Sequence, residues 1–303
     1  MQFIPKYKTI SLKVVTDILF NVKRGLLKNG IYIVATPIGN LKDISERAKE
    51  VLSAADIIAC EDTRVARKLF SLLGLPAHKE FIRLEDHNEA EQTEMLVLEA
   101  QKGKIIAQIS DAGSPLISDP GYKLVHRCRE VGVDVFAIPG ACALICALQL
   151  SGLPTNSFMF AGFIPNKEKA RKDLFNKLKD IDTTLIFYET ANRIVKSLAV
   201  AAEVFCDREL AVAREITKVY EECVNGTAQE LLAHFAAKEP KGEMVLMVSP
   251  PPEDIKTAGL DIEGLLKEQM KKESLKTAVK NIVEAYGLNK NEVYNLALKL
   301  KNE

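Results

Sequence analysis

The chain has 303 residues, of which 47% are hydrophobic and 27% are charged, proportions ordinary for a globular protein. Its 41 basic and 41 acidic residues cancel, so no overall field marks a nucleic-acid binder, although a local basic face fits the same balance. No apolar run approaches the roughly 20 residues that a membrane-spanning helix needs.

The N-terminal segment, residues 1–29, precedes the first clear strand. It is basic and carries a weak apolar stretch, residues 12–22, interrupted by Asp17. No small-residue cleavage site follows, so the segment does not resemble a signal peptide. We expect an accessory helix or a dispensable extension.

From Gly30 onward, strands alternate with helices. We expect strands over 31–35, 56–60, 104–109 and 134–138, and helices over 45–54, from about 63 through 73, and over 89–101 and 121–131. Ser45 is expected to cap the first of these helices. Alternation of this kind predicts an α/β domain with a mostly parallel sheet over residues 30–152.

The rhythm breaks at residues 152–155, which suggests a domain boundary. A second α/β domain is expected over 153–249, with strands at 158–162, 184–188, 209–213 and 243–248 and helices at 167–178, 191–204 and 227–238. Three consecutive prolines, residues 250–252, begin a stiff linker that runs to residue 261. Residues 262–303 read as a helical extension, with a helix pair at 274–286 and 289–299.

Two strand ends are rich in glycine and proline. Residues 36–40 follow the first strand, and residues 110–121 follow the strand at 104–109. Small residues let a ligand approach the backbone, and parallel sheets bind ligands at the carboxyl ends of their strands. A shared small-molecule site is the better interpretation, although either segment alone fits an elaborate turn.

Six cysteines are scattered among apolar neighbours: Cys60, Cys128, Cys142, Cys146, Cys206 and Cys223. Only Cys142 and Cys146 are close in sequence, and no second pair or histidine cluster accompanies them. We expect reduced thiols, no metal site and a cytoplasmic location.

Seven segments in a fixed order carry a family resemblance. They are VATPIGNLKDIS (34–45), ACEDTRVARKLF (59–70), HNE (87–89), SDAGSPLISDPG (110–121), IPGACA (138–143), LIFYETANRI (185–194) and AREITKVYEE (213–222). Together they resemble the ribosomal RNA small-subunit methyltransferase I family, a branch of the tetrapyrrole methylase superfamily. The helical extension also resembles that of the family.

The resemblance implies an S-adenosylmethionine-dependent enzyme with the cofactor in a cleft between two α/β domains. It implies 2′-O-methylation of a cytidine in small-subunit ribosomal RNA, alone or in an assembled subunit, and a homodimer. The residues that match the family's cofactor loops are Pro37, Ala112, Gly113, Ser114, Ile117, Cys142, Ala143, Tyr188 and Ile216, the last two from the second domain. Relatives commonly carry a hydroxyl residue where this chain has Cys142, so only a backbone contact is expected there.

A ribose hydroxyl is a poor nucleophile and needs a base, or a cation that favours its alkoxide. Polar residues at strand ends are candidates: Glu61, Asp62, Arg64, His87, Asn88, Asp111, Glu189, Arg193, Glu215 and Lys218. We single out Glu61, Arg64, His87 and Asp111, with His87 as the base of near-neutral pKa. Residues 61–64 equally fit a helix N-terminus, and Asp111 equally fits a loop-shaping role.

RNA contact requires a local basic surface. Residues 167–179 hold six basic and two acidic side chains, and the helical extension adds Lys267, Lys271, Lys272, Lys276 and Lys280. A solvated helix face explains these lysines equally well.

Three other functions compete with this interpretation. A tetrapyrrole carbon methylase would favour several arginines in the cleft, and this chain has few. A non-catalytic RNA-binding module would place binding in residues 262–303 alone. A dinucleotide-binding enzyme is disfavoured because no Gly-x-Gly-x-x-Gly follows the first strand.

Overall fold

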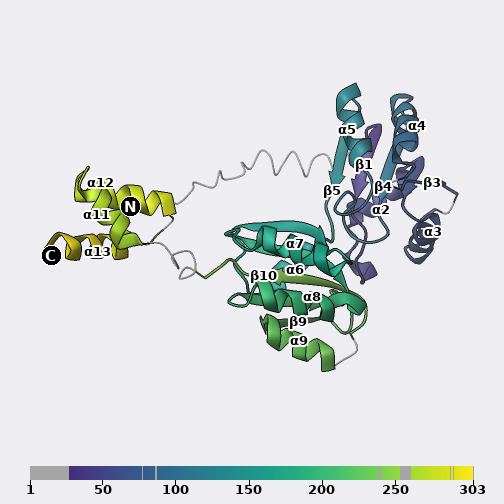
Figure 1. Ribbon diagram of the computed structural model, residues 1–303. Helices are drawn as coiled ribbons and strands as arrows, with labels where there is room; N and C mark the ends of the chain where they lie inside the picture. Colours follow the sequence, from purple (N-terminus) through teal and green to yellow (C-terminus); the bar gives the residue numbers. More distant parts are fainter. Residues whose placement is uncertain are drawn as a thin grey trace. The chain divides into compact units, whose positions relative to one another are not determined.

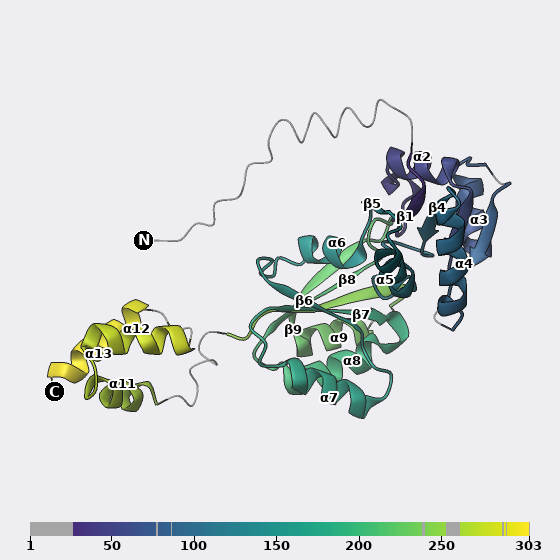
Figure 2. The ribbon, with the colours of Figure 1, turned by 90° about the horizontal axis from the view of Figure 1, so that it is seen from above.

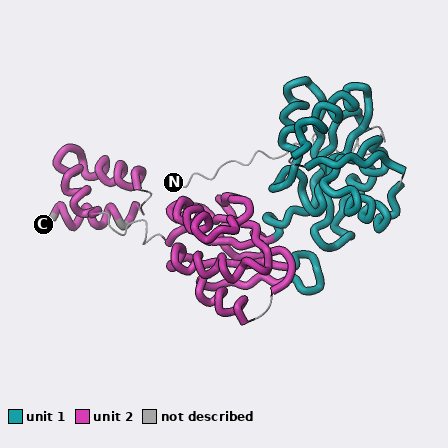
Figure 3. Tube along the Cα trace, turned by 45° about the vertical axis from the view of Figure 1, so that its right-hand side comes forward, with its two compact units in different colours: residues 1–146, 215–221 teal, residues 147–214, 222–303 magenta. Residues whose placement is uncertain are grey.

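The computed structural model describes residues 27–302 except 77, 86, 238–239, 253–260, 287 and 289. The expected N-terminal extension therefore lies almost entirely outside the described residues. Contacts divide the chain into two compact units (Figure 3), and the division falls between Cys146 and Ala147, ahead of the expected boundary at 152. The first unit also includes Glu215–Glu221. No helix within the described ranges is long and apolar enough to cross a membrane.

The first unit is an α/β domain. Its strands are β1 (Gly30–Val34), β2 (Ile57–Cys60), β3 (Glu80–Arg83), β4 (Ile105–Ile109) and β5 (Val135–Ile138). Its helices are η1 (Leu41–Asp43), α2 (Glu46–Ala54), α3 (Thr63–Leu72), α4 (Glu89–Gln101) and α5 (Tyr122–Val131), and α6 (Ala143–Leu150) crosses the division. The predicted strands and helices of this half are confirmed to within one or two residues at most ends. The short strand β3, with a charged residue at each end, was not expected.

The five strands form one parallel sheet in the order β3-β2-β4-β1-β5. Residues of α2 and α3 pack with Val34, Cys60 and Ile109 on one face, and residues of α4 and α5 pack with Ile31 and Ile106 on the other. Burial on both faces explains why these strands read as continuous apolar runs.

The connections of this sheet leave its centre in opposite directions. From β1 the chain passes through α2 to β2 on one side, and from β4 it passes through α5 to β5 on the other (Figure 1). Because β1 and β4 are neighbours, the point between their carboxyl ends is a topological switch point. Open α/β sheets bind ligands at such points.

The second unit is also α/β, but its sheet is mostly antiparallel. Its elements are β6 (Phe158–Phe163), α7 (Glu168–Leu178), β7 (Thr184–Thr190), α8 (Ala191–Val204), β8 (Glu209–Arg214), β9 (Glu222–Thr227), α9 (Ala228–Ala237) and β10 (Glu243–Val248). The order is β6-β7-β10-β8-β9, and only β6 and β7 run parallel. Residues of α7, α8 and α9 share one core on one side of the sheet (Figure 2). The half-buried strand β9 was missed because its sequence, Glu-Cys-Val-Asn-Gly-Thr, has no apolar run.

Three helices follow the linker: α11 (Ile262–Met270), α12 (Leu275–Tyr286) and α13 (Lys290–Asn302). They share a core of their own, formed by Leu266, Val279, Ile282, Val293 and Ala297. The predicted helical character of this region is confirmed, and α11 completes the expected pair to a three-helix unit.

Hydrogen-bonded caps begin two helices of the first unit. Ser45 Oγ accepts from the Ala48 amide at 3.1 Å, which confirms the predicted cap of α2. Asp62 Oδ1 accepts from the Arg64 amide at 2.7 Å at the start of α3. Side-chain oxygens at these positions satisfy amides that lack partners within the helix.

Glu89 ties α4 to the start of α5. Its side chain is buried, and Oε1 accepts from the amides of Gly121 and Lys123, both at 2.9 Å. Gln108 Nε2, on β4, donates to the carbonyl of Pro120 at 2.7 Å. The motif His87–Glu89 therefore contributes a buried cap to the neighbouring helix.

We expect Glu89→Ala to lower the free energy of unfolding by about 1–3 kcal/mol, because a buried amide and a part-buried one lose their acceptor. The matched variant Glu89→Gln retains Oε1 as an acceptor, and it should lose less than about 1 kcal/mol. Urea unfolding followed by circular dichroism measures both. Equal losses for the two variants would contradict the capping role.

Candidate active site

The carboxyl ends of β1 and β4 are joined by a two-way backbone bridge. The Thr36 amide donates to the Gly113 carbonyl at 2.8 Å, and the Gly113 amide donates to the Thr36 carbonyl at 3.1 Å. The buried Thr36 hydroxyl also donates to the Ser110 carbonyl at 3.3 Å. These bonds bring residues 36–40 (the β1 loop) and residues 110–121 (the β4 loop) together at the switch point.

The β4 loop has a constrained backbone. Leu116 and Ser118 have φ angles of 70° and 67°, which are uncommon for residues with a side chain. Gly113 has φ +84°, and a Cβ there would lie 3.2 Å from Cγ2 of Ile38. Ser114 Oγ donates to the Ala141 carbonyl at 3.0 Å, which ties this loop to the segment after β5. Unusual backbone angles of this kind cluster at functional sites.

A third segment, Glu215–Glu221 (the 215–221 loop), connects β8 to β9 but groups with the first unit. A Cβ added to Gly39 would lie 2.7 Å from Lys218 Cγ and 2.9 Å from Thr217 Oγ1. The β1 loop thus touches both the β4 loop, through Ile38, and the 215–221 loop, through Gly39. Ile216, expected from the second domain, lies in this segment of the first unit and is buried.

The residues expected to bind the cofactor are placed as follows. Pro37, Gly113 and Ser114 lie in loops at the switch point, with Ala112 and Ile117 as exposed members of the β4 loop. Cys142 and Ala143 lie at the start of α6, next to the Ala141 carbonyl that Ser114 contacts. Tyr188 belongs to the second unit, where its ring packs edge-on against Phe160 and Phe163 with centroids 4.8 and 5.4 Å apart.

Asp111 is linked to the end of β2. Its Oδ1 accepts from the Asp62 amide at 3.1 Å, and Asp62 in turn accepts from Arg64 Nη2 at 2.6 Å. Burial raises the pKa of the Asp111 carboxyl, and the negative charge of Asp62 adds to this effect. Hydrogen bonds from Arg64 hold the pKa of Asp62 well below its usual range. The hydrogen bonds through Asp62 therefore link the Asp111 carboxyl, whose pKa is raised, to the exposed side chain of Arg64.

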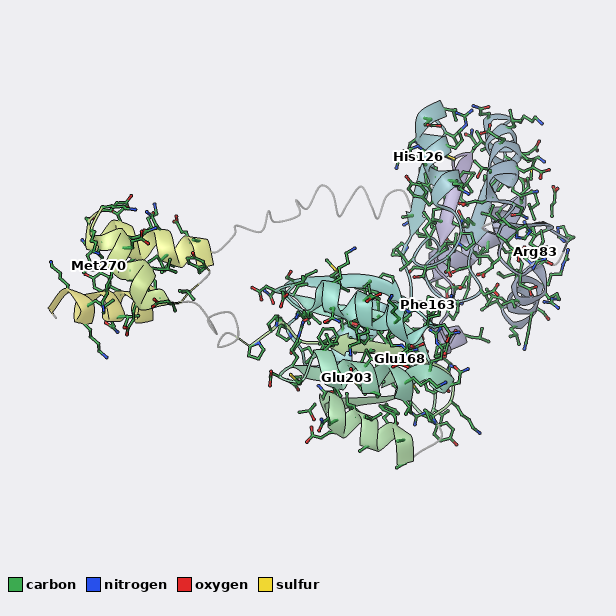
Figure 4. All side chains as sticks on the ribbon, viewed as in Figure 1. Arg83, His126, Phe163, Glu168, Glu203 and Met270 are labelled. Carbon is green, nitrogen blue, oxygen red and sulfur yellow. The ribbon has the colours of Figure 1, made fainter. Side chains whose placement is uncertain are left out.

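Three of the other acid–base candidates, Glu61, His87 and Asn88, lie nearer the β3 edge of the sheet. The Glu61 carbonyl accepts from Arg83 Nε at 3.4 Å, and Arg83, labelled in Figure 4, ends the edge strand β3. The His87 side chain is 77% exposed, with Nδ1 3.5 Å from Glu85 Oε2. Asn88 accepts from the Glu85 amide at 2.8 Å and donates to the Arg83 carbonyl at 3.1 Å, so it shapes the turn before α4.

Glu189 and Arg193 form a structural pair in the second unit. Glu189 is buried and accepts from Arg193 Nε at 2.7 Å, from Ser197 Oγ at 2.5 Å and from the Thr190 amide at 2.8 Å. Arg193 also donates to the Ile164 carbonyl at 3.0 Å. These bonds fix the first turns of α8 to β7, which accounts for both residues.

The basic stretch at residues 167–179 forms α7 and the positions beside it. Arg171 is buried and donates to the Asn166 carbonyl at 3.2 Å, so it is the one basic residue of this stretch that adds nothing to an exposed basic face. Its guanidinium packs into the core because every third or fourth position of α7 faces the sheet. The five lysines are exposed, and Lys172 pairs at 2.6 Å with Glu203 of α8, which is labelled in Figure 4.

All six cysteines are free thiols. Burial raises the pKa of Cys60 to about 12 and that of Cys128 to about 11, which keeps both protonated. Within the described part of the chain, no three His, Cys, Asp or Glu side chains gather as a metal site requires.

Two contributors to this site were not singled out from the sequence. Thr36 and Gly39 lie inside a motif that the sequence displays, but their tasks depend on partners far along the chain. A threonine directly after a buried strand, followed by proline, was the available signal. The Thr36 amide pairs with Gly113, 77 residues later.

Comparison with known proteins gives the family. Residues 30–232 match the family described as Tetrapyrrole (Corrin/Porphyrin) Methylases, and residues 256–301 match the RsmI C-terminal HTH domain. A relative from Erythrobacter litoralis, named Ribosomal RNA small subunit methyltransferase I, is 48% identical over 91% of this chain and 96% of its own length. Relatives of the same name from Haemophilus influenzae and Escherichia coli O157:H7 are 44% and 43% identical, each over 88% of this chain and over 96% and 94% of their own lengths.

Solved structures share the fold at low identity. A diphthine synthase has a TM-score of 0.56 at 15% identity, over 73% of this chain and 89% of its own. The methyltransferase CobJ gives the same TM-score and identity over 73% of this chain and 94% of its own. Because the family model matches residues 30–232 and the relatives are 43–48% identical over most of the chain, the chain belongs to the ribosomal RNA small subunit methyltransferase I family of the tetrapyrrole methylases.

Proposed function

We propose that this chain is an S-adenosylmethionine-dependent enzyme that methylates the 2′-hydroxyl of a cytidine in small-subunit ribosomal RNA. The observation that carries the proposal is the 48% identity to a relative named Ribosomal RNA small subunit methyltransferase I, over more than nine-tenths of both chains. The fold alone decides little, because structures with similar TM-scores include a diphthine synthase (0.56) and a cobalt precorrin-4 methyltransferase (0.53). Both are only 15% identical to this chain, which leaves the tetrapyrrole alternative without comparable support.

The switch-point loops fit the cofactor. S-adenosylmethionine, when bound, supplies a methyl group on a sulfonium. A ligand without phosphates needs close backbone approach and apolar walls, and glycine at 39 and 113 keeps these crowded loop backbones free of side chains. We propose that Pro37, Ala112, Gly113, Ser114 and Ile117 hold its methionine and ribose parts. The remaining contacts are assigned to Cys142, Ala143, Tyr188 and Ile216.

Alignment of the hydroxyl with the methyl donor supplies much of the rate in a displacement of this kind. We assign the proton-accepting role to Asp111, supported by its raised pKa and its place in the β4 loop. Arg64 is 87% exposed in its side chain and suits the developing alkoxide or a phosphate. Glu61 and His87 remain candidates for contacts with the RNA.

The RNA surface is assigned to the exposed lysines of residues 167–179 and to the helices α11 to α13. Phosphate contacts of this kind fix position without reading sequence. The match of residues 256–301 to a helix-turn-helix domain supports a share for the helical extension. An RNA-binding module without catalysis would have no use for the switch-point loops, so that alternative does not account for them.

We further propose a homodimer in the cytoplasm. The edge strand β6 exposes Phe158, Met159 and Phe163 (the last is labelled in Figure 4), an apolar set that a second copy would cover. Six free thiols suit a reducing compartment, where ribosomal RNA is also modified.

Gly113→Val should weaken S-adenosylmethionine binding at least tenfold, because φ +84° strains a β-branched residue and its Cβ meets Ile38. Gly103→Val is the matched control, since Gly103 has φ +96°, no neighbour within 4 Å and a place before β4, at the opposite edge of the sheet. Isothermal titration calorimetry measures both. Wild-type affinity in Gly113→Val, or equal losses in both variants, would refute the site.

Asp111→Asn tests the proton acceptor. We expect methyl transfer to fall by roughly 10²–10⁴-fold, the usual contribution of a general base, with cofactor affinity retained. The free energy of unfolding should rise in this variant. The raised pKa of Asp111 means that its charged carboxylate destabilises the fold at neutral pH, and asparagine removes that charge. The gain should shrink as pH falls through the raised pKa, because the wild-type carboxyl is then protonated. A wild-type transfer rate would instead assign Asp111 to holding the loop.

Transfer of labelled methyl groups tests the function itself. Purified protein and labelled cofactor are incubated with unmodified small ribosomal subunits, with free small-subunit RNA and with a precorrin-type macrocycle. We expect label in the RNA, at a cytidine ribose, and none in the macrocycle. Label in the macrocycle alone would overturn the proposed function.

A further inference from the structure

Val219 and Tyr220 stand at the tip of the 215–221 loop. They are 92% and 73% exposed, the largest exposed fractions among the large hydrophobic side chains of the described residues. Adjacent apolar side chains that remain exposed to solvent can mark a contact surface. The residues at the start of the loop face inward instead: Ile216 is buried and Thr217 is half-buried.

The loop that carries this pair is held rigidly. The Thr217 amide donates to Glu221 Oε2 at 2.6 Å, and the Glu221 amide donates to the Lys218 carbonyl at 3.2 Å. At its base, Arg214 pairs directly with Glu222 across β8 and β9, and their side chains form an ion pair at 2.6 Å. A backbone that is already fixed reduces the entropy that the loop loses when its side chains bind a partner.

The loop also borders the candidate active site. Lys218 and Thr217 lie against Gly39 of the β1 loop, so the tip begins one residue beyond a direct contact with the switch-point site. Glu215 and Thr217 adopt φ angles of 50° and 66°, and strain of this kind persists where the surrounding structure fixes it.

The charges of the loop are engaged within it. Glu215 pairs with Lys218 at 2.9 Å, while Glu221 accepts from the Thr217 amide and Glu222 pairs with Arg214. The tip thus offers an apolar and an aromatic surface rather than a phosphate-binding charge. Exposed aromatic rings beside RNA sites bind by stacking on unpaired bases.

We propose that Tyr220 stacks on an unpaired base of the substrate RNA, with Val219 packing beside it, and so positions the target nucleotide at the switch-point site. The inference rests on the proposed function and names a substrate-binding residue for it. A second copy of the chain is the competing occupant. Two adjacent side chains supply little of the roughly 800 Å² that each partner of a stable dimer buries.

Steady-state kinetics with small ribosomal subunits tests the role of Tyr220. Tyr220→Ala should raise the KM for RNA about tenfold or more, in line with about 1–3 kcal/mol for one stacked base, and should leave cofactor affinity unchanged. Tyr220→Phe keeps the ring and should restore the KM. Leu98→Ala, at a 54% exposed leucine of α4, is the control for loss of an exposed apolar side chain.

A spectroscopic readout comes from Tyr220→Trp, because the chain contains no other tryptophan. Stacking should quench its emission when a single-stranded oligoribonucleotide of the substrate sequence is added. An unchanged KM in Tyr220→Ala overturns the inference while leaving the proposed function intact, provided the wild type methylates RNA. Absence of quenching, or a dimer-to-monomer shift of Tyr220→Ala in analytical ultracentrifugation, also overturns it. A wild type that transfers no methyl group to RNA overturns both proposals.

Discussion

The close backbone approach between Thr36 and Gly113 is the constraint on which the candidate site depends. Two hydrogen bonds, at 2.8 and 3.1 Å, join the loops that follow two adjacent parallel strands whose connections leave in opposite directions. Gly113 needs φ +84° to make them, and Ile38 fills the space where its side chain would stand. The bonded loops meet the 215–221 loop through Gly39, so one short segment after β1 organises three stretches of chain.

Much of the first unit could be predicted from its sequence because buried parallel strands are continuous apolar runs and its helices have visible caps. Ser45 capped α2 as expected, since an N-cap is a local signal. The strands β3 and β9 were not predicted, because each is half-exposed and lacks a periodic apolar pattern. The packing of Ile216 with the first unit was also not predicted, because the order of elements along the chain does not encode a long-range contact.

The candidate polar residues divide by environment rather than by motif. Glu89 and Glu189 lie in two of the family motifs, yet both are buried carboxylates that accept hydrogen bonds from backbone amides and hold helices in place. Arg171 sits in a basic stretch but points into the core. Asp111 combines a raised pKa with a position in the β4 loop at the switch point. Sequence indicates residue types, and only the packing separates a structural carboxylate from one placed to act.

The central claim is that the β1 loop, the β4 loop and the 215–221 loop form one cofactor site. Hydrogen–deuterium exchange of the full chain, with and without saturating S-adenosylmethionine, tests it most directly. The account predicts slowed exchange in residues 36–40, 110–121 and 215–221 together, with no change in residues 262–302. Protection confined to one of the three loops, or centred on the helical extension, would contradict it.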